Sequence, residues 1–186
     1  MNKAFLEYEI LDDPFIEKGP ILIGNPAFSS LGLKVQFLPE KQDSWVANLT
    51  KGGTPLSGFW FLNAPNVLIL AGGAAYIINT SEKKIIATPG HDNYYNLIQR
   101  SDGLLILSDS TKLTVIMSDS SYWDSEQISI DGFKDLEINN NVVSGMSWSP
   151  TTIPGKWIPF TFDLETREIH GGSYQMLRSL PKADKS

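Results

Sequence analysis

The segment Trp157–Tyr174, WIPFTFDLETREIHGGSY, constrains the fold of this chain more than any other. Apolar side chains occupy every second position over residues 158–164, and this two-residue period is typical of a strand with one buried face. The polar residues 165–167 predict a turn, after which the chain returns. Gly171 and Gly172 give the backbone the freedom it needs where a strand ends or lets a neighbour approach. The segment therefore predicts a β-hairpin.

The same hairpin pattern recurs along the chain, with turn centres near Ser81, Asp109, Asn140 and Thr166. These centres are about 28, 31 and 26 residues apart (109−81, 140−109, 166−140). Pro159 lacks an N–H group, so its strand is expected at a sheet edge or beside a bulge. The regular spacing predicts an all-β fold, an antiparallel meander of repeated hairpins in a short or open propeller-like array. A full blade needs roughly 40–45 residues, which allows about four blades at most, and a β-sandwich is the alternative architecture.

The remaining segments are assigned by pattern and composition. Residues 33–38, 44–50 and 59–62 are expected to be strands, the last of them buried. Two helical turns, capped by the preceding aspartate, are expected over 93–100, and a short terminal helix over 173–180.

Length and composition favour one β-rich domain over residues 1–180, followed by a frayed tail over 181–186. The absence of cysteine excludes disulfides and thiolate metal sites. The N-terminal residues lack the apolar core of a signal peptide. The longest apolar run nearby, residues 67–71, is too short to cross a bilayer. We therefore expect a cytoplasmic protein that does not engage a membrane.

The formal net charge of −6 disfavours binding to nucleic acid, because a polyanion would be repelled. A solvated acidic surface is the simplest interpretation of this charge. The functional alternative is an acidic face that meets a basic partner and raises the rate of association.

The sequence offers no recognisable catalytic or cofactor-binding motif. His91 and His170 lie in no known nucleophile–base arrangement, and the glycine-rich segments match no phosphate-binding pattern. Asp163, Glu165 and Glu168 could in principle converge with His170 on a cation, but this spacing does not predict a metal site. No catalytic residue, cofactor or metal is therefore predicted. A glycosidase with an unidentified pair of carboxylates stays open, because such a pair leaves no sequence signature.

Aromatic side chains are the best candidates for a binding role. Tyr122 and Trp123 lie in the acidic segment SDSSYWDSE, among Asp119, Asp124 and Glu126. Core packing is the usual role of such rings, but a segment of serines and acids is unlike a core. An aromatic pair surrounded by carboxylates would suit a basic protein surface or a sugar. These five residues are the predicted partner-binding site.

The elements ISIDGFKDLEI, VVSGMSWSP, FTFDLETREI and GGSY, between about Ile128 and Tyr174, carry a family resemblance. This part of the chain resembles small uncharacterised bacterial proteins with propeller-like or meander folds, some of them suspected toxin-immunity proteins. The resemblance implies a non-catalytic cytoplasmic protein that neutralises a basic toxin domain by covering its active surface. A carbohydrate-binding or ligand-binding β module with aromatic platforms is the alternative.

Overall fold

The computed structural model describes residues 6–11, 21–22, 32–39, 43–90, 93–151 and 153–179. These residues form sixteen strands and one short helix, so the predicted all-β fold is confirmed. The chain divides into two compact units, Met1–Asn93 and Tyr94–Ser186, each of which holds two four-stranded sheets. The single domain over 1–180 stays a prediction, and the predicted tail lies outside the described residues.

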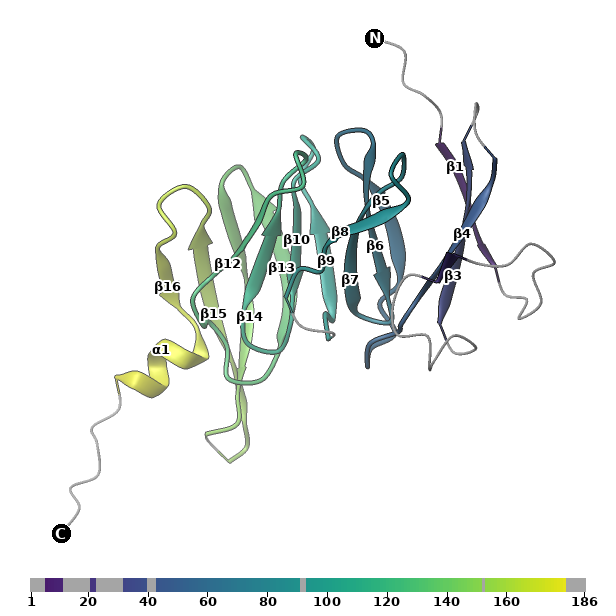
Figure 1. Ribbon diagram of the computed structural model, residues 1–186. Coiled ribbons are helices and arrows are strands. Elements are labelled where there is room, and N and C mark those ends of the chain that lie inside the picture. Colours follow the sequence, from purple (N-terminus) through teal and green to yellow (C-terminus); the bar gives the residue numbers. More distant parts are fainter. Residues whose placement is uncertain are drawn as a thin grey trace. The chain divides into compact units, whose positions relative to one another are not determined.

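The N-terminal unit contains the first two sheets (Figure 1). The first sheet has the order β1-β3-β4-β2, and β2 pairs in parallel with β4 while the other neighbours are antiparallel. The second sheet follows chain order and is antiparallel throughout. The strands are β1 (Leu6–Leu11), β2 (Ile21–Leu22), β3 (Leu33–Pro39), β4 (Trp45–Leu49), β5 (Gly58–Phe61), β6 (Asn66–Ala71), β7 (Ala74–Asn79) and β8 (Lys84–Ala87).

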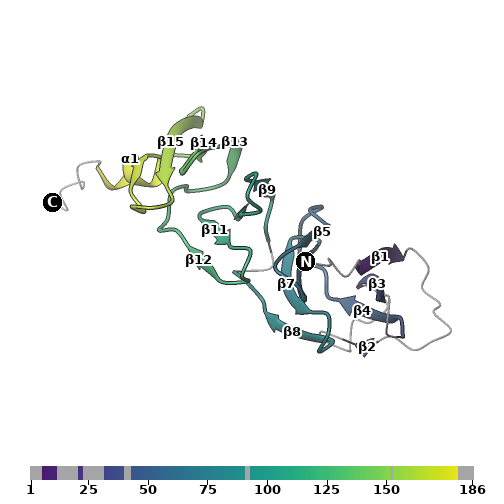
Figure 2. The same ribbon diagram turned by 90° about the horizontal axis from the view of Figure 1, so that it is seen from above.

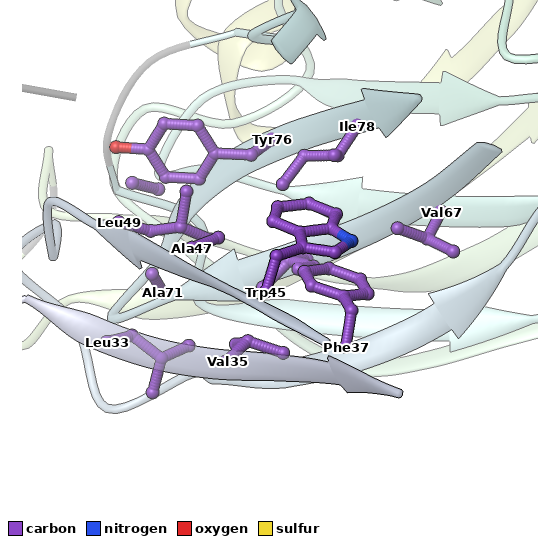
Figure 3. Packing of buried hydrophobic residues seen from close by; sticks show 12 residues of the cluster. Leu33, Val35, Phe37, Trp45, Ala47, Leu49, Val67, Ala71, Tyr76 and Ile78 are labelled. Carbon is purple, nitrogen blue, oxygen red and sulfur yellow. The ribbon is translucent and has the colours of Figure 1, made fainter. Parts of the chain in front are cut away.

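These two sheets share one hydrophobic core (Figure 3). Trp45, Ala47 and Leu49 contribute to it from β4, as their two-residue spacing predicts. The rings of Phe37 and Trp45 stack inside it with centroids 4.1 Å apart. The core residues are Leu33, Val35, Phe37, Trp45, Ala47, Leu49, Val67, Ile69, Ala71, Ala74, Tyr76 and Ile78.

Strand β5 is less buried than predicted, because it is one of the two edge strands of the second sheet. Phe59 packs against the shared core and stacks on Tyr8 with ring centroids 3.7 Å apart. Phe61 leaves 57% of its surface exposed. The prediction of a fully buried strand over 59–62 is therefore wrong.

The C-terminal unit contains the third and fourth sheets, in the orders β12-β11-β10-β9 and β13-β14-β15-β16. Both are antiparallel and built from strands consecutive in the chain. A helix, α1 (Ser173–Arg178), follows the last strand, as predicted. The strands are β9 (Asn96–Gln99), β10 (Leu105–Ser108), β11 (Leu113–Ile116), β12 (Tyr122–Asp124), β13 (Phe133–Asn139), β14 (Val142–Ser149), β15 (Lys156–Asp163) and β16 (Ile169–Gly171).

The alternation that predicts strand β15 also defines the core of this unit. Phe160 and Phe162 are buried, whereas Pro159 and Thr161, which alternate with them along the strand, are exposed. The core joins apolar residues of the third and fourth sheets, so the predicted inward face is confirmed. Its buried members are Ile106, Leu113, Val115, Ile128, Phe133, Val143, Phe160 and Phe162.

Strand β9 replaces the helix predicted over residues 93–100. Leu97 and Ile98 lie opposite Leu107 and Ile106 of β10, and these cross-strand pairs stabilise an extended backbone. Eight residues cannot hold a helix by local propensity alone, so tertiary packing decides their conformation. The helix prediction is wrong, and the aspartate expected to cap it lies outside the described residues.

The repeating element of the fold is the four-stranded sheet. Its repeat length in residues is greater than the hairpin spacing that the sequence predicts. Strands β5, β9 and β13 begin at residues 58, 96 and 133, which are 38 and 37 residues apart (96−58, 133−96). This interval is close to the roughly 40 residues of a propeller blade. From β5 onward each sheet uses consecutive strands, unlike the Greek-key connections of a β-sandwich. From β5 onward the fold is therefore an antiparallel meander of blade-like sheets.

A polar cluster around Arg100 ties three turns of the C-terminal unit together. Arg100 donates through Nε and Nη2 to the carboxylate of Asp102, at 2.9 and 2.8 Å. Its Nη1 donates to the carbonyl oxygen of Asn140 and to Oδ1 of Asn141, at 3.2 and 2.8 Å. Asn141 in turn donates to Glu165 at 3.3 Å. This bidentate geometry suits arginine and would be lost with lysine.

The Arg100–Asp102 pair predicts a pH-dependent contribution to stability. The hydrogen bond from Arg100 lowers the pKa of Asp102 from 3.8 to about 2. Because the folded pKa is depressed, the contribution is complete above about pH 4 and is lost as the pH falls through 2. Asp102→Asn should therefore lower the thermal midpoint at pH 5, and the difference from wild type should shrink at pH 2. Equal differences at both pH values would contradict this, and Asp131→Asn is the control for charge removal.

Candidate functional site: the edge strand β12

The predicted site residues surround β12, a three-residue strand at the edge of the third sheet. Among the described residues β12 pairs with β11 alone, and Figure 2 shows β12 and β9 at opposite ends of this sheet. Tyr122, Asp124 and the neighbouring Asp119 and Glu126 are all exposed. An edge strand presents unpaired backbone groups as well as side chains, so it is a natural place for another chain to bind.

The turn before β12 is held by Asp119. Its Oδ1 accepts hydrogen bonds from the backbone N–H and the hydroxyl of Ser121, at 2.9 and 2.5 Å. These bonds, the hydroxyl first, lower the pKa of Asp119, so its carboxylate is charged at neutral pH. Ser120 takes a positive φ of 75° at the tip of the turn. Asp119 therefore has a structural task in addition to its charge.

The two aromatic residues of the predicted site lie on opposite faces of the third sheet. Tyr122 and Asp124 pair with Ile116 and Thr114, whereas Trp123 pairs with Val115 between them. Successive side chains of a strand point to opposite faces. The structure therefore brings Tyr122 and Asp124 together on one face and separates Trp123 from them.

A chain of hydrogen bonds orients the carboxylate of Asp124. The hydroxyl of Thr114 donates to Oδ1 of Asp124 at 2.7 Å, and the hydroxyl of Tyr94 donates to the oxygen of Thr114, also at 2.7 Å. Tyr94 is fully buried, and burial raises its pKa well above the ordinary value, so it remains a donor. Asp124 is thus held from inside the unit while its side chain remains exposed to solvent.

The Trp123 side chain mainly stabilises the fold of the C-terminal unit and is less available for binding at the surface. Its ring packs against the core and meets Phe162 edge to face, with centroids 5.9 Å apart. The guanidinium carbon of Arg167 lies 4.4 Å from the ring centroid, which is a cation–π arrangement. Trp123 therefore links β12 to the β15–β16 hairpin.

This arrangement predicts different effects for the two aromatic residues. Trp123→Ala should lower the free energy of unfolding by about 2–4 kcal/mol, because the ring leaves a cavity beside Phe162. Tyr122→Ala should change it by less than about 1 kcal/mol, because 41% of Tyr122 is already exposed. Urea unfolding of both variants measures the difference. Equal losses would show that Tyr122 is also part of the core.

The segment after β12 returns at once to the interior. Ser125 is buried, and its backbone N–H donates to the carbonyl of Leu113 at 2.8 Å. Its Oγ accepts the N–H of Leu113 at 3.0 Å and donates to the carbonyl of Glu126 at 2.7 Å. These bonds anchor the C-terminal end of β12 and leave the Glu126 side chain in solvent.

A second aromatic pair lies on the outer face of the fourth sheet. Trp148 and Trp157 are cross-strand partners with ring centroids 5.0 Å apart, and Nζ of Lys134 lies 4.7 Å from the Trp157 ring. Residues 149–156 separate these tryptophans in the sequence, and only the register of β14 and β15 shows that they are neighbours. Such a pair stabilises the hairpin.

The carboxylates considered as metal ligands make other interactions in the structure. Asp163 accepts hydrogen bonds from the N–H groups of Glu165 and Thr166, both at 2.8 Å, and holds the β15–β16 turn. These bonds, that of Thr166 first, lower the pKa of Asp163. His170 lies 3.8 Å from Glu168 at the surface. Within the described part of the chain, no group of three or more potential ligands is placed to hold a metal ion.

No family model matches the chain, and a search of curated proteins finds no match. Similar solved structures include the extracellular domain of a protein assigned to a hybrid two component system from B. thetaiotaomicron (14% identity, 74% of this chain, 22% of that chain, TM-score 0.43). Kuenenia stuttgartiensis hydrazine synthase is also similar (12% identity, 87% and 50%, TM-score 0.45). A third is virginiamycin B lyase from Staphylococcus aureus (11% identity, 90% and 74%, TM-score 0.38).

The similarity of these structures to this chain is too low for a shared activity to be inferred. The chain spans 22% to 50% of the length of the first three structures that it matches. The class of the protein is defined by its own sheets: the residues that the structure describes form four four-stranded sheets, which is an all-β fold. No helix in the described ranges has the length and apolar character needed to span a membrane.

Proposed function

We propose that the chain is a non-catalytic binding protein that uses the edge strand β12 to engage a basic surface of another protein. One observation carries this proposal: an exposed tyrosine and an internally held carboxylate lie on one face of an open sheet edge. Tyr122 supplies a large ring, and Asp124 is oriented by Thr114 and Tyr94. Asp119 and Glu126 add negative charge on either side.

The two kinds of side chain would contribute in different ways. Tyrosine is a frequent anchor in protein interfaces, because its ring buries much area with little loss of side-chain freedom. Carboxylates at the rim of an interface mainly raise the association rate and make binding sensitive to salt. An oriented carboxylate loses less conformational freedom on binding than a mobile one. Asp124 and Tyr122 are therefore the residues whose change should affect binding most.

Toxin neutralisation is one form that this binding could take. An immunity protein acts by covering the active surface of a toxin, and a basic toxin domain would complement the net charge of −6. The proposed role requires no cofactor, and it places the protein in the same cytoplasm as its target. The resemblance of the C-terminal segment supports this form of the proposal.

The proposal can be tested with the products of the genes that flank the gene of this chain. Each basic product is passed over the immobilised chain in a biosensor at low and high salt. One of them should bind, with an association rate that falls steeply as salt rises. Asp124→Asn combined with Glu126→Gln should lower that rate by about tenfold, and Tyr122→Ala should raise the dissociation rate.

A matched control separates the site from net charge. Asp131→Asn combined with Glu137→Gln removes two exposed carboxylates from the same unit outside the β12 edge, as many charges as the edge variant loses, and it should leave binding nearly unchanged. The proposal is wrong if no basic neighbour binds, or if the edge variants bind as well as this control variant does.

The Trp148–Trp157 pair supports a second candidate function, a carbohydrate-binding or ligand-binding module. Both rings are half-buried rather than enclosed, and they lie on a sheet face together with Lys134. Aromatic rings beside polar groups can receive a sugar face. A glycan array tests this candidate, and binding that survives Trp157→Ala would exclude this pair as the sugar site.

A further inference from the structure

Along β12, residues whose backbone N–H and carbonyl groups bond to β11 alternate with residues whose groups face away from β11. The N–H of Met117 donates to the carbonyl of Ser121, and the N–H of Ser125 donates to the carbonyl of Leu113. In an antiparallel ladder, hydrogen-bonded and non-hydrogen-bonded pairs alternate. Trp123 therefore directs its backbone groups toward β11. By the same alternation, Tyr122 and Asp124 direct theirs away from β11, toward the open edge.

The outward backbone groups and the exposed side chains thus belong to the same two residues. Tyr122 and Asp124 each offer one N–H and one carbonyl to an incoming strand, and their side chains share one face of the sheet. This is the arrangement that strand addition uses: main-chain hydrogen bonds supply affinity, and alternate side chains supply specificity. An edge of this kind can form up to four backbone hydrogen bonds, two through its N–H donors and two through its carbonyl acceptors.

We infer that β12 accepts an extended basic segment of a partner protein as an additional antiparallel strand. This inference rests on the proposed function, because it specifies how the partner occupies the same site. An antiparallel strand is chosen because it pairs slightly more stably per residue than a parallel one.

The register defines the chemistry of the incoming segment. Directly opposite residues of an antiparallel pair interact through their side chains. The residue opposite Asp124 is therefore lysine or arginine, and the residue opposite Tyr122 is apolar or aromatic. Because the strands run in opposite directions, the partner reads basic, then any residue, then apolar. Further basic residues beyond each end would reach Glu126 and Asp119.

Charge also decides against a second copy of this chain as the occupant. Two β12 strands paired about Trp123 would bring Glu126 of one copy close to Asp119 of the other. Like charges near one another across strands are destabilising. Acidic residues at an edge protect a sheet from self-pairing and leave it open to a strand of opposite charge.

A synthetic peptide tests the inference without knowledge of the natural partner. The probe is acetyl-Arg-Thr-Lys-Thr-Ile-Thr-Arg-amide, in which the lysine is opposite Asp124 and the isoleucine is opposite Tyr122. It is titrated into the isotope-labelled full chain, and amide hydrogen exchange is followed by NMR. The amides of Tyr122 and Asp124 should exchange fast in the free protein and at least about tenfold more slowly with bound peptide. The Trp123 amide is protected in both states.

Two methylated peptides are the matched controls. Methylation of the isoleucine nitrogen removes an N–H that faces β12, so binding should weaken by at least about tenfold. Methylation of the threonine nitrogen between the lysine and the isoleucine removes an N–H that faces away, so binding should change little. Both peptides keep the same charge and length, and a purely electrostatic contact would not distinguish them.

The outcomes separate this inference from the proposed function. Failure of the unmodified peptide to bind at millimolar concentration overturns strand addition. Strand addition is also overturned if the two methylated peptides bind equally well, or if bound peptide does not protect the Tyr122 and Asp124 amides from exchange. If a basic protein partner still depends on these side chains, the proposed function stands and only its strand geometry is wrong.

Discussion

Replacing Phe162 by alanine is expected to lower the free energy of unfolding by about 3–5 kcal/mol, because the ring is almost fully buried and its removal leaves a cavity. Phe162 lies opposite Val143 and Ile169 in the fourth sheet and meets the edge of Trp123 from the third. The loss should therefore loosen the packing between these two sheets. Urea unfolding followed by tryptophan fluorescence measures it.

Phe61→Ala is the matched control for this change. The residue type is the same, but Phe61 is 57% exposed at a sheet edge, so its removal should cost less than about 1 kcal/mol. A loss below about 1 kcal/mol for Phe162→Ala as well would show that the core of the C-terminal unit does not depend on the inward face of β15.

Replacing Gly171 by alanine is expected to cost about 2–5 kcal/mol, from two additive causes. Its φ of 76° lies in the left-handed region, where an L-residue is strained by about 1–2 kcal/mol. The added Cβ would also lie 2.5 Å from the carbonyl oxygen of Pro159, which belongs to the backbone of the neighbouring strand and cannot move freely. Relieving such overlap typically costs a further 1–3 kcal/mol, so roughly that much is expected at this position.

Gly103→Ala separates the two causes. Gly103 also has a positive φ, 94°, but its added Cβ would meet no described atom within 4 Å. This variant should lose only the backbone term, about 1–2 kcal/mol. If both variants have the same thermal midpoint, the close approach of the strands at Gly171 contributes nothing to the requirement for glycine there.

The hairpins could be predicted from the sequence because the signals for their strands and turns come from residues close together in the chain. Asn140 takes a positive φ of 53° in the β13–β14 turn, as expected for an asparagine between two short apolar runs. Phe160 and Phe162 face the core because a two-residue period allows only one side of a strand to be apolar. Gly171 lies where the sequence places a close approach.

Properties that depend on strand neighbours could not be predicted in this way. The sequence predicts Pro159 at an edge or bulge, yet β15 is an inner strand with continuous register to β14, so that prediction is wrong. The missing N–H of Pro159 is tolerated because the three-residue strand β16 has already ended there. The last residue pair between β15 and β16 is Phe160 with Gly171. The N–H of Gly172 still donates to the Pro159 carbonyl at 3.0 Å. The sequence does not reveal where a neighbouring strand stops.

Composition predicts the candidate site but not its geometry. An acidic segment with two aromatic residues identifies Tyr122 and Trp123, but their consecutive positions on a strand place them on opposite faces. Sequence reasoning misses the contributions of Thr114 and Tyr94, because they come from other parts of the chain and become neighbours of Asp124 only through folding. The signal that could have separated the two rings is a strand assignment for residues 122–124.

The sequential order of strands within the second, third and fourth sheets has a consequence for how the molecule is made. Each of these sheets is completed by residues that follow one another along the polypeptide, so its pairings require little loop closure. Topologies of this kind generally fold faster than those built from distant segments. Each sheet can assemble soon after its last strand leaves the ribosome. Duplication or deletion of about 38 codons would lengthen or shorten such an array without rerouting the rest of the polypeptide.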